Sequence, residues 1–288
     1  MLRIALPNKG RLAEETRELF TDAGLDVRAA STRALTASLG GEFEAIFVRA
    51  QDIPEFVADG AAEAGVTGFD LVSESGRDLE TLLDFGFGRC RLVVAAKDDC
   101  GYAGVADLAR AKRVATSFPR LTRRWFEGQG IAIEVVPVSG AAEIAPHLGI
   151  ADVVVDLVST GSTLRVNGLR ELATLTESTA RLIARPGAAD GDGARAQSVR
   201  ELVTALESVL RARGQRYLMA NVPRTALDRV KAVLPGLNGP TVTEVMNGGT
   251  IVAVHAVVPA QGIYRTIAEL RAVGAEGILV TRIERLVP

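Results

Sequence analysis

A run of small hydroxyl residues follows an apolar stretch and an acidic residue near the middle of the chain. Residues 153–155 are all valine, Asp156 comes next, and a helical pattern begins shortly afterwards. The run contains Ser159, Thr160, Gly161, Ser162 and Thr163. Free backbone N–H groups at a helix start, with nearby hydroxyl donors, can bind a phosphate, and a glycine lets the backbone approach it closely. A carboxylate just upstream suits ribose hydroxyls, so the pattern favours a nucleotide or a sugar phosphate.

A Ser/Thr helix cap without a ligand is the alternative interpretation of this run. A Walker phosphate loop is excluded, because the Gly-x-x-x-x-Gly-Lys pattern is absent.

Cationic and glycine residues follow two other apolar stretches in the N-terminal part. Lys9, Gly10 and Arg11 come after the stretch 2–6, and Arg49 comes after Phe47 and Val48. Taken one at a time, these are typical of solvated loop charges. Together with the hydroxyl run, they place complementary charge at one edge of a sheet, which favours a cleft for a polyanion.

Histidine and cysteine are too scarce for several kinds of site. The chain has two of each, His147, His255, Cys90 and Cys100. These numbers and spacings exclude a zinc cluster or a disulfide framework and disfavour a Ser/His/Asp or Cys/His nucleophile system. We expect structural or surface roles for all four.

Composition limits the class of protein. The 288 residues are 48% hydrophobic and 24% charged, with a formal net charge of −2. These values are typical of a globular protein of about two domains and give no electrostatic footprint of a nucleic-acid binder. The N-terminus lacks the pattern of a signal peptide, and no apolar stretch reaches the ~20 residues of a membrane span. We therefore expect a soluble cytoplasmic protein.

Apolar strand patterns and helical patterns alternate through the first two thirds of the chain. The expected strands are 2–6, 44–48, 64–67, 91–95, 113–116, 133–137 and 152–155. The expected helices are 12–23, 53–58, 105–111, 121–129 and 141–148. This alternation predicts an α/β fold with mostly parallel sheet, buried on both faces, and ligands at the carboxyl ends of the strands.

Two segments of this part echo one another. Residues 65–73 and 149–159 both end in Asp-Leu-Val-Ser, at Asp70 and Asp156. The echo indicates either chance similarity or two similar lobes that each present an aspartate to a shared cleft.

The C-terminal part has a different pattern. A turn-rich segment at 186–193 precedes a helix at 199–210. Strands are expected at 216–222, 241–246, 250–258 and 277–283, with helices at 223–233 and 263–273. Asn247-Gly248-Gly249 is a hairpin signal between the second and third strands. This order, βαββαβ, predicts a separate ferredoxin-like domain, which by fold analogy serves ligand sensing or dimerisation.

Three motifs together resemble the ATP phosphoribosyltransferase family, long form. They are Pro7-Asn8-Lys9-Gly10-Arg11-Leu12, Gly65-Val66-Thr67-Gly68-x-Asp70, and the motif from Glu143 through Asp156 to Leu164. The resemblance covers essentially the whole chain. It implies a two-lobed, periplasmic-binding-protein-like catalytic core with a C-terminal ferredoxin-like regulatory domain. Lobe I would be 1–88 and 184–212, lobe II 89–183 and the regulatory domain 213–288.

The resemblance also implies an activity. The family transfers the phosphoribosyl group of phosphoribosyl pyrophosphate to N1 of ATP, releasing pyrophosphate, in the first step of histidine biosynthesis. Mg²⁺ would arrive on pyrophosphate, with no protein metal ligand. Histidine would bind the regulatory domain as a feedback inhibitor. The enzyme would be a homo-oligomer, dimer and hexamer, without a separate regulatory subunit, a membrane or a nucleic acid as partner.

The resemblance also implies roles for the residues of this chain that match the family's motifs. Ser159 and Thr160–Thr163 would hold the 5′-phosphate, Asp156 the ribose hydroxyls, and Glu143 would lie near the ribose and Mg²⁺. Lys9, with Asp156 and Glu143, would be catalytic. The residues of the other lobe that would face ATP and pyrophosphate are Lys9, Gly10, Arg11, Arg49 and Asp70. Around histidine would be Asn221, Thr241 and Gly277. Many members have arginine in place of Ser162 and an acidic residue in place of Asn221.

Two other functions stay open on the sequence. One is a solute-binding or sensor protein, because the two-lobed fold is shared with transport receptors. The other is an inactive paralogue that only senses histidine. The missing signal-peptide pattern and the hydroxyl run disfavour the first, and the retained Asp156 with the intact Thr160–Thr163 loop disfavours the second.

Overall fold

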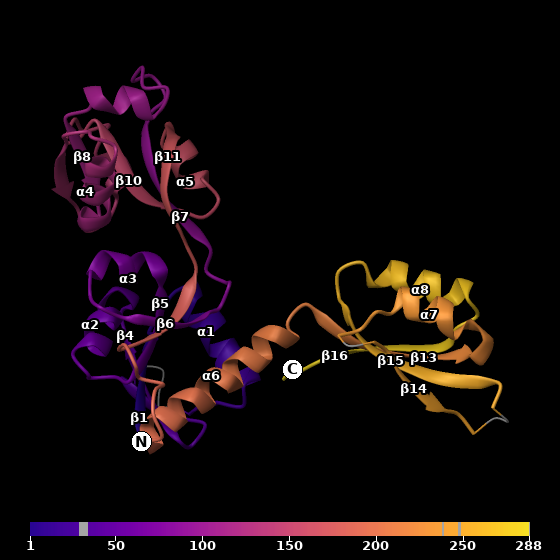
Figure 1. Ribbon diagram of the computed structural model, residues 1–288. Helices are drawn as coiled ribbons and strands as arrows, with labels where there is room; N and C mark the ends of the chain where they lie inside the picture. The colour runs from indigo at the N-terminus through magenta and orange to yellow at the C-terminus, as the bar shows by residue number, and fades with distance from the viewer. Residues whose placement is uncertain (29–33, 238, 247–248, 288) are drawn as a thin grey trace. The chain divides into compact units, whose positions relative to one another are not determined.

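The computed structural model describes residues 1–28, 34–237, 239–246 and 249–287 and is shown in Figure 1. The chain divides into two compact units, Met1–Val203 and Thr204–Pro288. In the described residues the strands form three sheets, of seven, five and four strands. The first two sheets belong to the first unit and the third to the second unit.

The seven-stranded sheet has the order β2-β3-β4-β1-β5-β12-β6. Its strands are β1 (Leu2–Pro7), β2 (Val27–Arg28), β3 (Thr36–Leu39), β4 (Phe43–Val48), β5 (Ala64–Gly68), β6 (Glu80–Asp84) and β12 (Ala180–Ala184). Its helices are α1 (Arg11–Asp22), the 3₁₀ turn η1 (Ala50–Asp52), α2 (Ile53–Ala58) and α3 (Phe69–Ser75). Only β4, β1 and β5 run parallel, so the expectation of a mostly parallel sheet is wrong here: antiparallel strands extend a parallel centre.

The five-stranded sheet has the order β11-β7-β10-β8-β9. Its strands are β7 (Cys90–Lys97), β8 (Arg113–Thr116), β9 (Glu134–Pro137), β10 (Val153–Val158) and β11 (Leu169–Ser178). The helical elements are η2 (Val105–Arg110), α4 (Pro119–Gly128), η3 (Ala142–Ile144) and α5 (Ser162–Val166). Strands β10, β8 and β9 are parallel, whereas β7 and β11 are antiparallel additions.

Burial on both faces of these sheets agrees with the sequence. In β10, Val153 and Val155 pack with Phe126 of α4, while Val154 packs with Leu164 of α5 on the opposite face. An uninterrupted valine run fits this environment because neighbouring side chains of a strand point to opposite faces.

The chain passes between the two sheets twice. It leaves the first sheet after β6 and enters the second at Cys90, close to the expected crossing at Gly88. It returns at Thr179, between Ser178 of β11 and Ala180 of β12. The return to lobe I expected near Ala184 thus comes earlier in the chain than expected. Ala184 lies at the end of β12, which already pairs with β5 in the first sheet.

Two expected helices are shorter and tighter than the sequence indicated. Residues 105–111 form the 3₁₀ element η2, and of 141–148 only η3 is helical. Pro146 explains the second difference, because proline has no N–H and clashes with the preceding turn of an α-helix. The sequence does not predict strands β2, β3, β6, β11 and β12, which lack a long apolar run or a clear alternation.

The C-terminal unit has the expected βαββαβ order, preceded by α6 (Ala194–Ala212). Its elements are β13 (Gln215–Pro223), η4 (Arg224–Ala226), α7 (Leu227–Val233), β14 (Thr241–Glu244), β15 (Ile251–Pro259), α8 (Ile263–Ala272) and β16 (Glu276–Arg282). All pairs are antiparallel in the order β14-β15-β13-β16, the ferredoxin-like topology. The expected hairpin turn lies partly outside the described residues, at 247–248.

Candidate active site

Asp156 lies on β10, close to the carboxyl end of the strand. Its side chain is half-buried, and its Oδ1 accepts a hydrogen bond from the backbone N–H of Leu157 at 2.8 Å. Burial raises the pKa of Asp156 above the ordinary aspartate value, and the negative charge of Glu143 raises it further. The site therefore concentrates negative charge where a ligand hydroxyl or a cation would stabilise it.

Glu143 is brought to Asp156 by the 3₁₀ element η3, which packs against β10. The residue just before η3, Ala141, has a φ of 50°, the one positive φ of a non-glycine residue in the described part of the chain. Alanine is disfavoured in this left-handed conformation, and such strain is concentrated at functional sites. The structure thus places Glu143 beside Asp156, as the sequence-based interpretation requires.

The hydroxyl run forms an exposed loop that ends in α5. Ser159, Thr160, Ser162 and Thr163 are exposed, whereas Gly161 is buried. The hydroxyl oxygens of Thr160 and Ser162 lie 2.9 Å apart. The structure therefore presents several hydroxyl groups to solvent on one short loop.

The conformation of this loop depends on a glycine at position 161. Its φ is 74°, a conformation open to glycine at little energy, and a Cβ atom here would lie 3.2 Å from Oε1 of Glu171. Glu171 in turn accepts two hydrogen bonds from the guanidinium of Arg91, at 2.8 and 3.2 Å. Hydrogen bonding to Glu171 raises the pKa of Arg91. The loop therefore lies against an ion pair that sequence reasoning missed.

The cationic loops of the first sheet lie side by side because their strands are neighbours. Pro7 of β1 pairs with Val48 of β4, and the Asn8 N–H donates to the Val48 carbonyl at 2.9 Å. Lys9 and Arg49, the exposed residues that follow, therefore come from adjacent strand ends. Gly10 precedes α1 with a φ of 81°.

Arg11 projects from the start of α1. Its side chain is 77% exposed, and its Nε donates to Oε1 of Glu15 at 3.0 Å. One carboxylate therefore orients the guanidinium while leaving most of it open to solvent.

Asp70 differs from the other charged residues expected at the site because it is buried. It is 3% exposed, Ser178 Oγ donates to its Oδ1 at 2.5 Å, and its backbone N–H donates to Ser178 Oγ at 3.0 Å. Burial raises its pKa, against the opposing effect of the Ser178 hydrogen bond. A Cβ on Gly68 would overlap Asp70 Oδ1, which explains the glycine in this motif. Asp70 thus contacts the second chain crossing directly.

Two cavities lie at the crossings. One, of about 290 Å³, is lined by the expected residues Arg11, Asp70 and Ser159, together with Leu157, Arg89 and Cys90 among others. It brings expected residues of both sheets to one space. The residues lining it do not include Asp156, Glu143, Lys9, Arg49 or Thr160–Thr163.

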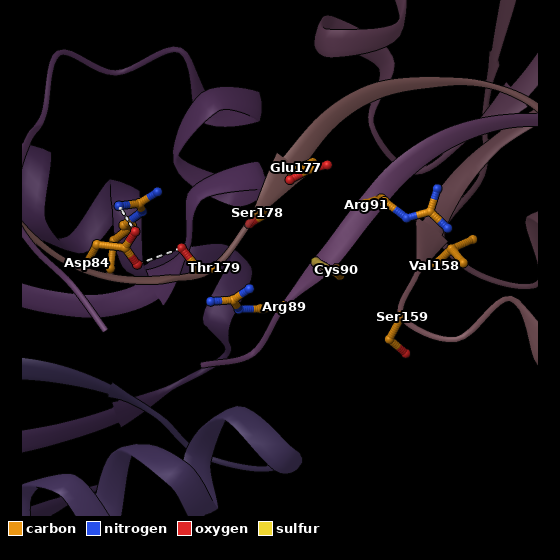
Figure 2. Close-up of a pocket in the computed structure, with 10 residues that line it drawn as sticks. Asp84, Arg89, Cys90, Arg91, Val158, Ser159, Glu177, Ser178 and Thr179 are labelled. Carbon is orange, nitrogen blue, oxygen red and sulfur yellow. Dashed lines mark hydrogen bonds and ion pairs between the residues drawn. The ribbon is translucent and has the colours of Figure 1, made fainter. Parts of the chain in front are cut away.

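The second cavity, of about 380 Å³, is shown in Figure 2. Three arginines line it, Arg89, Arg91 and Arg181, with Ser159 from the hydroxyl loop. Arg181 pairs with Asp84 at 2.6 Å, and Arg89 Nε donates to the Gly86 carbonyl at 3.1 Å. Of these cations, Arg89 and Arg91 stand just after the expected crossing at Gly88, which is a weak sequence signal, whereas Arg181 comes from β12.

The residues expected around histidine lie in one sheet of the C-terminal unit. Asn221 of β13 and Gly277 of β16 are neighbours, since a Cβ on Gly277 would lie 3.2 Å from Asn221 Nδ2. Thr241 is on β14, paired with His255 of β15. Strand β15 therefore separates Thr241 from Asn221 in the sheet.

Outside the masked positions, no group of three or more His, Cys, Asp and Glu side chains could hold a metal ion. Within the described chain, no helix is long and apolar enough to cross a membrane.

Comparisons with known proteins agree with these features. A family model described as ATP phosphoribosyltransferase matches residues 49–208, and one described as the HisG C-terminal domain matches residues 212–285. ATP phosphoribosyltransferase of Gemmatimonas aurantiaca is 72% identical over 292 aligned positions that span both chains completely. That of Natronomonas pharaonis is 49% identical over 288, again across both chains.

Among solved structures, the ATP phosphoribosyl transferase (HisG:HisZ) complex from Thermotoga maritima is similar, with a TM-score of 0.63 and 27% identity. The match covers 73% of this chain and 99% of that chain. About a quarter of this chain therefore has no counterpart in that one.

Proposed function

This chain belongs to the ATP phosphoribosyltransferase family, and from that membership we propose how its residues carry out the reaction. The enzyme transfers the phosphoribosyl group of phosphoribosyl pyrophosphate to N1 of ATP and releases pyrophosphate, the first step of histidine biosynthesis. The observation that carries this conclusion is 72% identity along the full length of both chains. Its fold is a two-lobed, periplasmic-binding-protein-like core followed by a ferredoxin-like domain.

In the proposed site, the hydroxyl loop binds the 5′-phosphate and Asp156 binds the ribose hydroxyls. The exposed Ser159, Thr160, Ser162 and Thr163 supply donors, and Gly161 keeps the loop open to a phosphate. The reaction displaces pyrophosphate at a carbon that becomes oxocarbenium-like, so positive charge develops on the sugar. The neighbouring carboxylates Asp156 and Glu143 stabilise that charge electrostatically.

Cations from the first sheet complete the proposal. Lys9 and Arg49 follow paired strand ends, and Arg11 lines a cavity with Ser159. They would attract the phosphates of ATP and the departing pyrophosphate. No histidine or cysteine is needed, because positioning and charge stabilisation suffice for this displacement.

Mg²⁺ fits this site as an ion carried mainly by the substrate. Asp156 and Glu143 are two carboxylates, fewer than a protein-built magnesium site needs, and Mg²⁺ commonly binds substrate phosphates and water with one or two carboxylates. When bound, it would neutralise pyrophosphate as a leaving group.

The C-terminal unit is proposed to bind histidine near Asn221, Gly277 and Thr241 and to inhibit the enzyme from there. The amide of Asn221 can accept a hydrogen bond from an ammonium group but cannot neutralise it, so inhibition is expected to be weaker than with an acidic residue. We further propose a cytoplasmic homo-oligomer, dimer and hexamer, that needs no separate regulatory subunit.

Near-ultraviolet absorbance tests both parts of the proposal, because N1-alkylated adenine absorbs differently. The reaction contains ATP, phosphoribosyl pyrophosphate, Mg²⁺ and a pyrophosphatase, with and without histidine. A rise that histidine suppresses supports the transferase and the histidine site. A rise that histidine leaves unchanged removes the histidine site only. No rise from folded protein, with phosphoribosyl pyrophosphate still bound, would instead favour an inactive sensor.

A further inference from the structure

Helix α4 begins without a cap of its own. The residue before it is Phe118, which has no side-chain acceptor, and the first helical residue is Pro119, which has no N–H. The first turn of a helix leaves backbone N–H groups without partners inside the helix. In α4 these are the amides of Arg120 and Leu121, since Thr122 N–H already donates to the Phe118 carbonyl at 3.0 Å.

The carboxylate of Glu74, on the helix α3 that packs with the seven-stranded sheet, accepts hydrogen bonds from both of these amides. Arg120 N–H donates to Glu74 Oε1 at 2.8 Å, and Leu121 N–H donates to Glu74 Oε2 at 2.9 Å. Glu74 belongs to α3, which follows β5 of the seven-stranded sheet. Both oxygens of one carboxylate therefore cap a helix that belongs to the five-stranded sheet, with the charge favoured at a helix N-terminus.

The contact is reciprocal. Arg120 lies against the end of α3, where a Cβ on Gly76 would overlap its guanidinium. Gly76 adopts a left-handed φ of 65°, which ends α3 and leaves space for that side chain. Glu74 of α3 therefore contacts the start of α4, and Arg120 of α4 contacts the end of α3.

This contact adds a third connection to the two chain crossings. Two extended crossings allow one lobe to rotate relative to the other, as in two-lobed binding folds. Glu74 lies one helical turn beyond Asp70, which is bonded to Ser178 at the second crossing, so the Glu74 contact constrains a rotation there. Helix α4 also follows β8, the parallel neighbour of the strand that carries Asp156.

From this geometry we infer that Glu74 is a positioning residue, which fixes the lobes so that substrate residues of both sheets meet one ligand. The inference rests on the proposed function, because the ligand in question is phosphoribosyl pyrophosphate. Loss of the contact should weaken substrate binding, while the chemical groups themselves stay intact.

The single tryptophan of the chain makes the contact measurable. Trp125 lies on α4, packed edge-on against Phe126 with ring centroids 4.9 Å apart. The experiment compares wild type, Glu74→Ala and Glu74→Gln by Trp125 emission, with and without phosphoribosyl pyrophosphate, and by kcat and KM. Glu127→Gln is the matched control, because it removes one exposed carboxylate from α4 close to the same tryptophan.

For Glu74→Ala we expect a red-shifted Trp125 emission that phosphoribosyl pyrophosphate reverses, and a KM for that substrate raised about five- to tenfold with kcat changed by less than about twofold. Glu74→Gln should be intermediate, because glutamine keeps one acceptor oxygen. Glu127→Gln should match wild type. Gly76→Ala displaces the Arg120 guanidinium but leaves Glu74 bonded to the α4 amides, so its KM should change less than that of Glu74→Ala.

Several results would overturn the inference. They are a Glu74→Ala enzyme with wild-type KM and emission, a Glu74→Ala enzyme with a lower melting temperature but unchanged KM, or a Glu127→Gln enzyme with the same KM change as Glu74→Ala. Failure of the proposed function is distinguishable, since a wild-type protein without transferase activity would remove the reaction but leave the emission comparison to decide the contact.

Discussion

Asp70 and Asp156 begin the same four residues, Asp-Leu-Val-Ser, yet the two regions around them have different structures. At Asp70 the sequence opens helix α3, and the carboxylate is buried against Ser178. At Asp156 the sequence continues strand β10, and the carboxylate is half-buried beside an exposed loop. One short sequence thus produces a buried contact with Ser178 in one lobe and, in the other, the carboxylate that we propose binds the ribose.

Strand pairing explains the difference. Residues 156–158 stay extended because they pair with 91–93 of β7. β5 pairs with β12 only as far as Gly68, and the chain then turns into a helix. Burial raises the pKa of both aspartates, so a raised pKa alone does not identify the reacting site. Exposure and neighbours decide which carboxylate can meet a substrate.

The largest effect expected from this comparison is at Asp156. Asp156→Ala should reduce kcat/KM by about a thousandfold or more, because it removes charge stabilisation at the sugar, while the melting temperature changes little. The absorbance assay and thermal unfolding measure the two effects. Activity close to wild type would contradict the ribose assignment, and Asp156→Asn, which keeps the shape, should remain strongly impaired.

At Asp70 the expected effect falls on stability instead. Asp70→Ala should lower the free energy of unfolding by about 2 kcal/mol, because Ser178 loses its buried partner. Urea unfolding measures this loss. A variant as stable as wild type but inactive would reverse the comparison and make Asp70 a substrate residue.

The pH dependence of Asp70 gives a second test of the same contact. Because burial raises its pKa in the folded state, its contribution to stability is full below the ordinary aspartate pKa and is lost as pH rises through the raised value. Wild type should therefore gain stability relative to Asp70→Asn as the pH is lowered through that window. Urea unfolding at several pH values checks the sign, and a gain on raising the pH would contradict it.

A smaller effect is expected in the hydroxyl loop that follows Asp156. Thr163→Val should raise the KM for phosphoribosyl pyrophosphate about tenfold with little change in kcat, because one phosphate donor is lost. Thr163→Ser, which keeps the hydroxyl, should restore most of the affinity. Steady-state kinetics at saturating ATP make the measurement, and an unchanged KM in Thr163→Val would count against the phosphate loop.

The sequence predicts the features that depend on neighbouring residues better than those that depend on residues far apart in the chain. The βαββαβ order and the strand end at Val48 follow from local apolar patterns and turn residues, whereas β10 continues to Val158, beyond the end expected at Val155. The burial of Asp70, the ion pair of Arg91 with Glu171 and the Glu74 contact join residues 46 to 108 positions apart. No local pattern encodes such pairs, because they form only when the sheets bring distant segments together.

The smallest expected effect concerns Cys90, because the charge of Asp70 affects the pKa of its thiol. Burial raises the pKa of the Cys90 thiol to about 11, and the negative charge of Asp70 contributes in the same direction, against a hydrogen bond with Ser178. Alkylation depends on the thiolate, so at pH 8 Cys90 should react much more slowly than a free, exposed thiol.

Asp70→Asn removes the charge but not the burial, so the alkylation rate of Cys90 should rise only a few-fold, and mass spectrometry of the labelled peptides measures it against Cys100 as the internal reference. The rise is small because burial, the larger cause of the raised pKa, remains in the variant. Asp156→Asn, made in the matching sequence of the other lobe, should leave the rate unchanged. Equal rates in wild type and Asp70→Asn would contradict the effect of the Asp70 charge on Cys90.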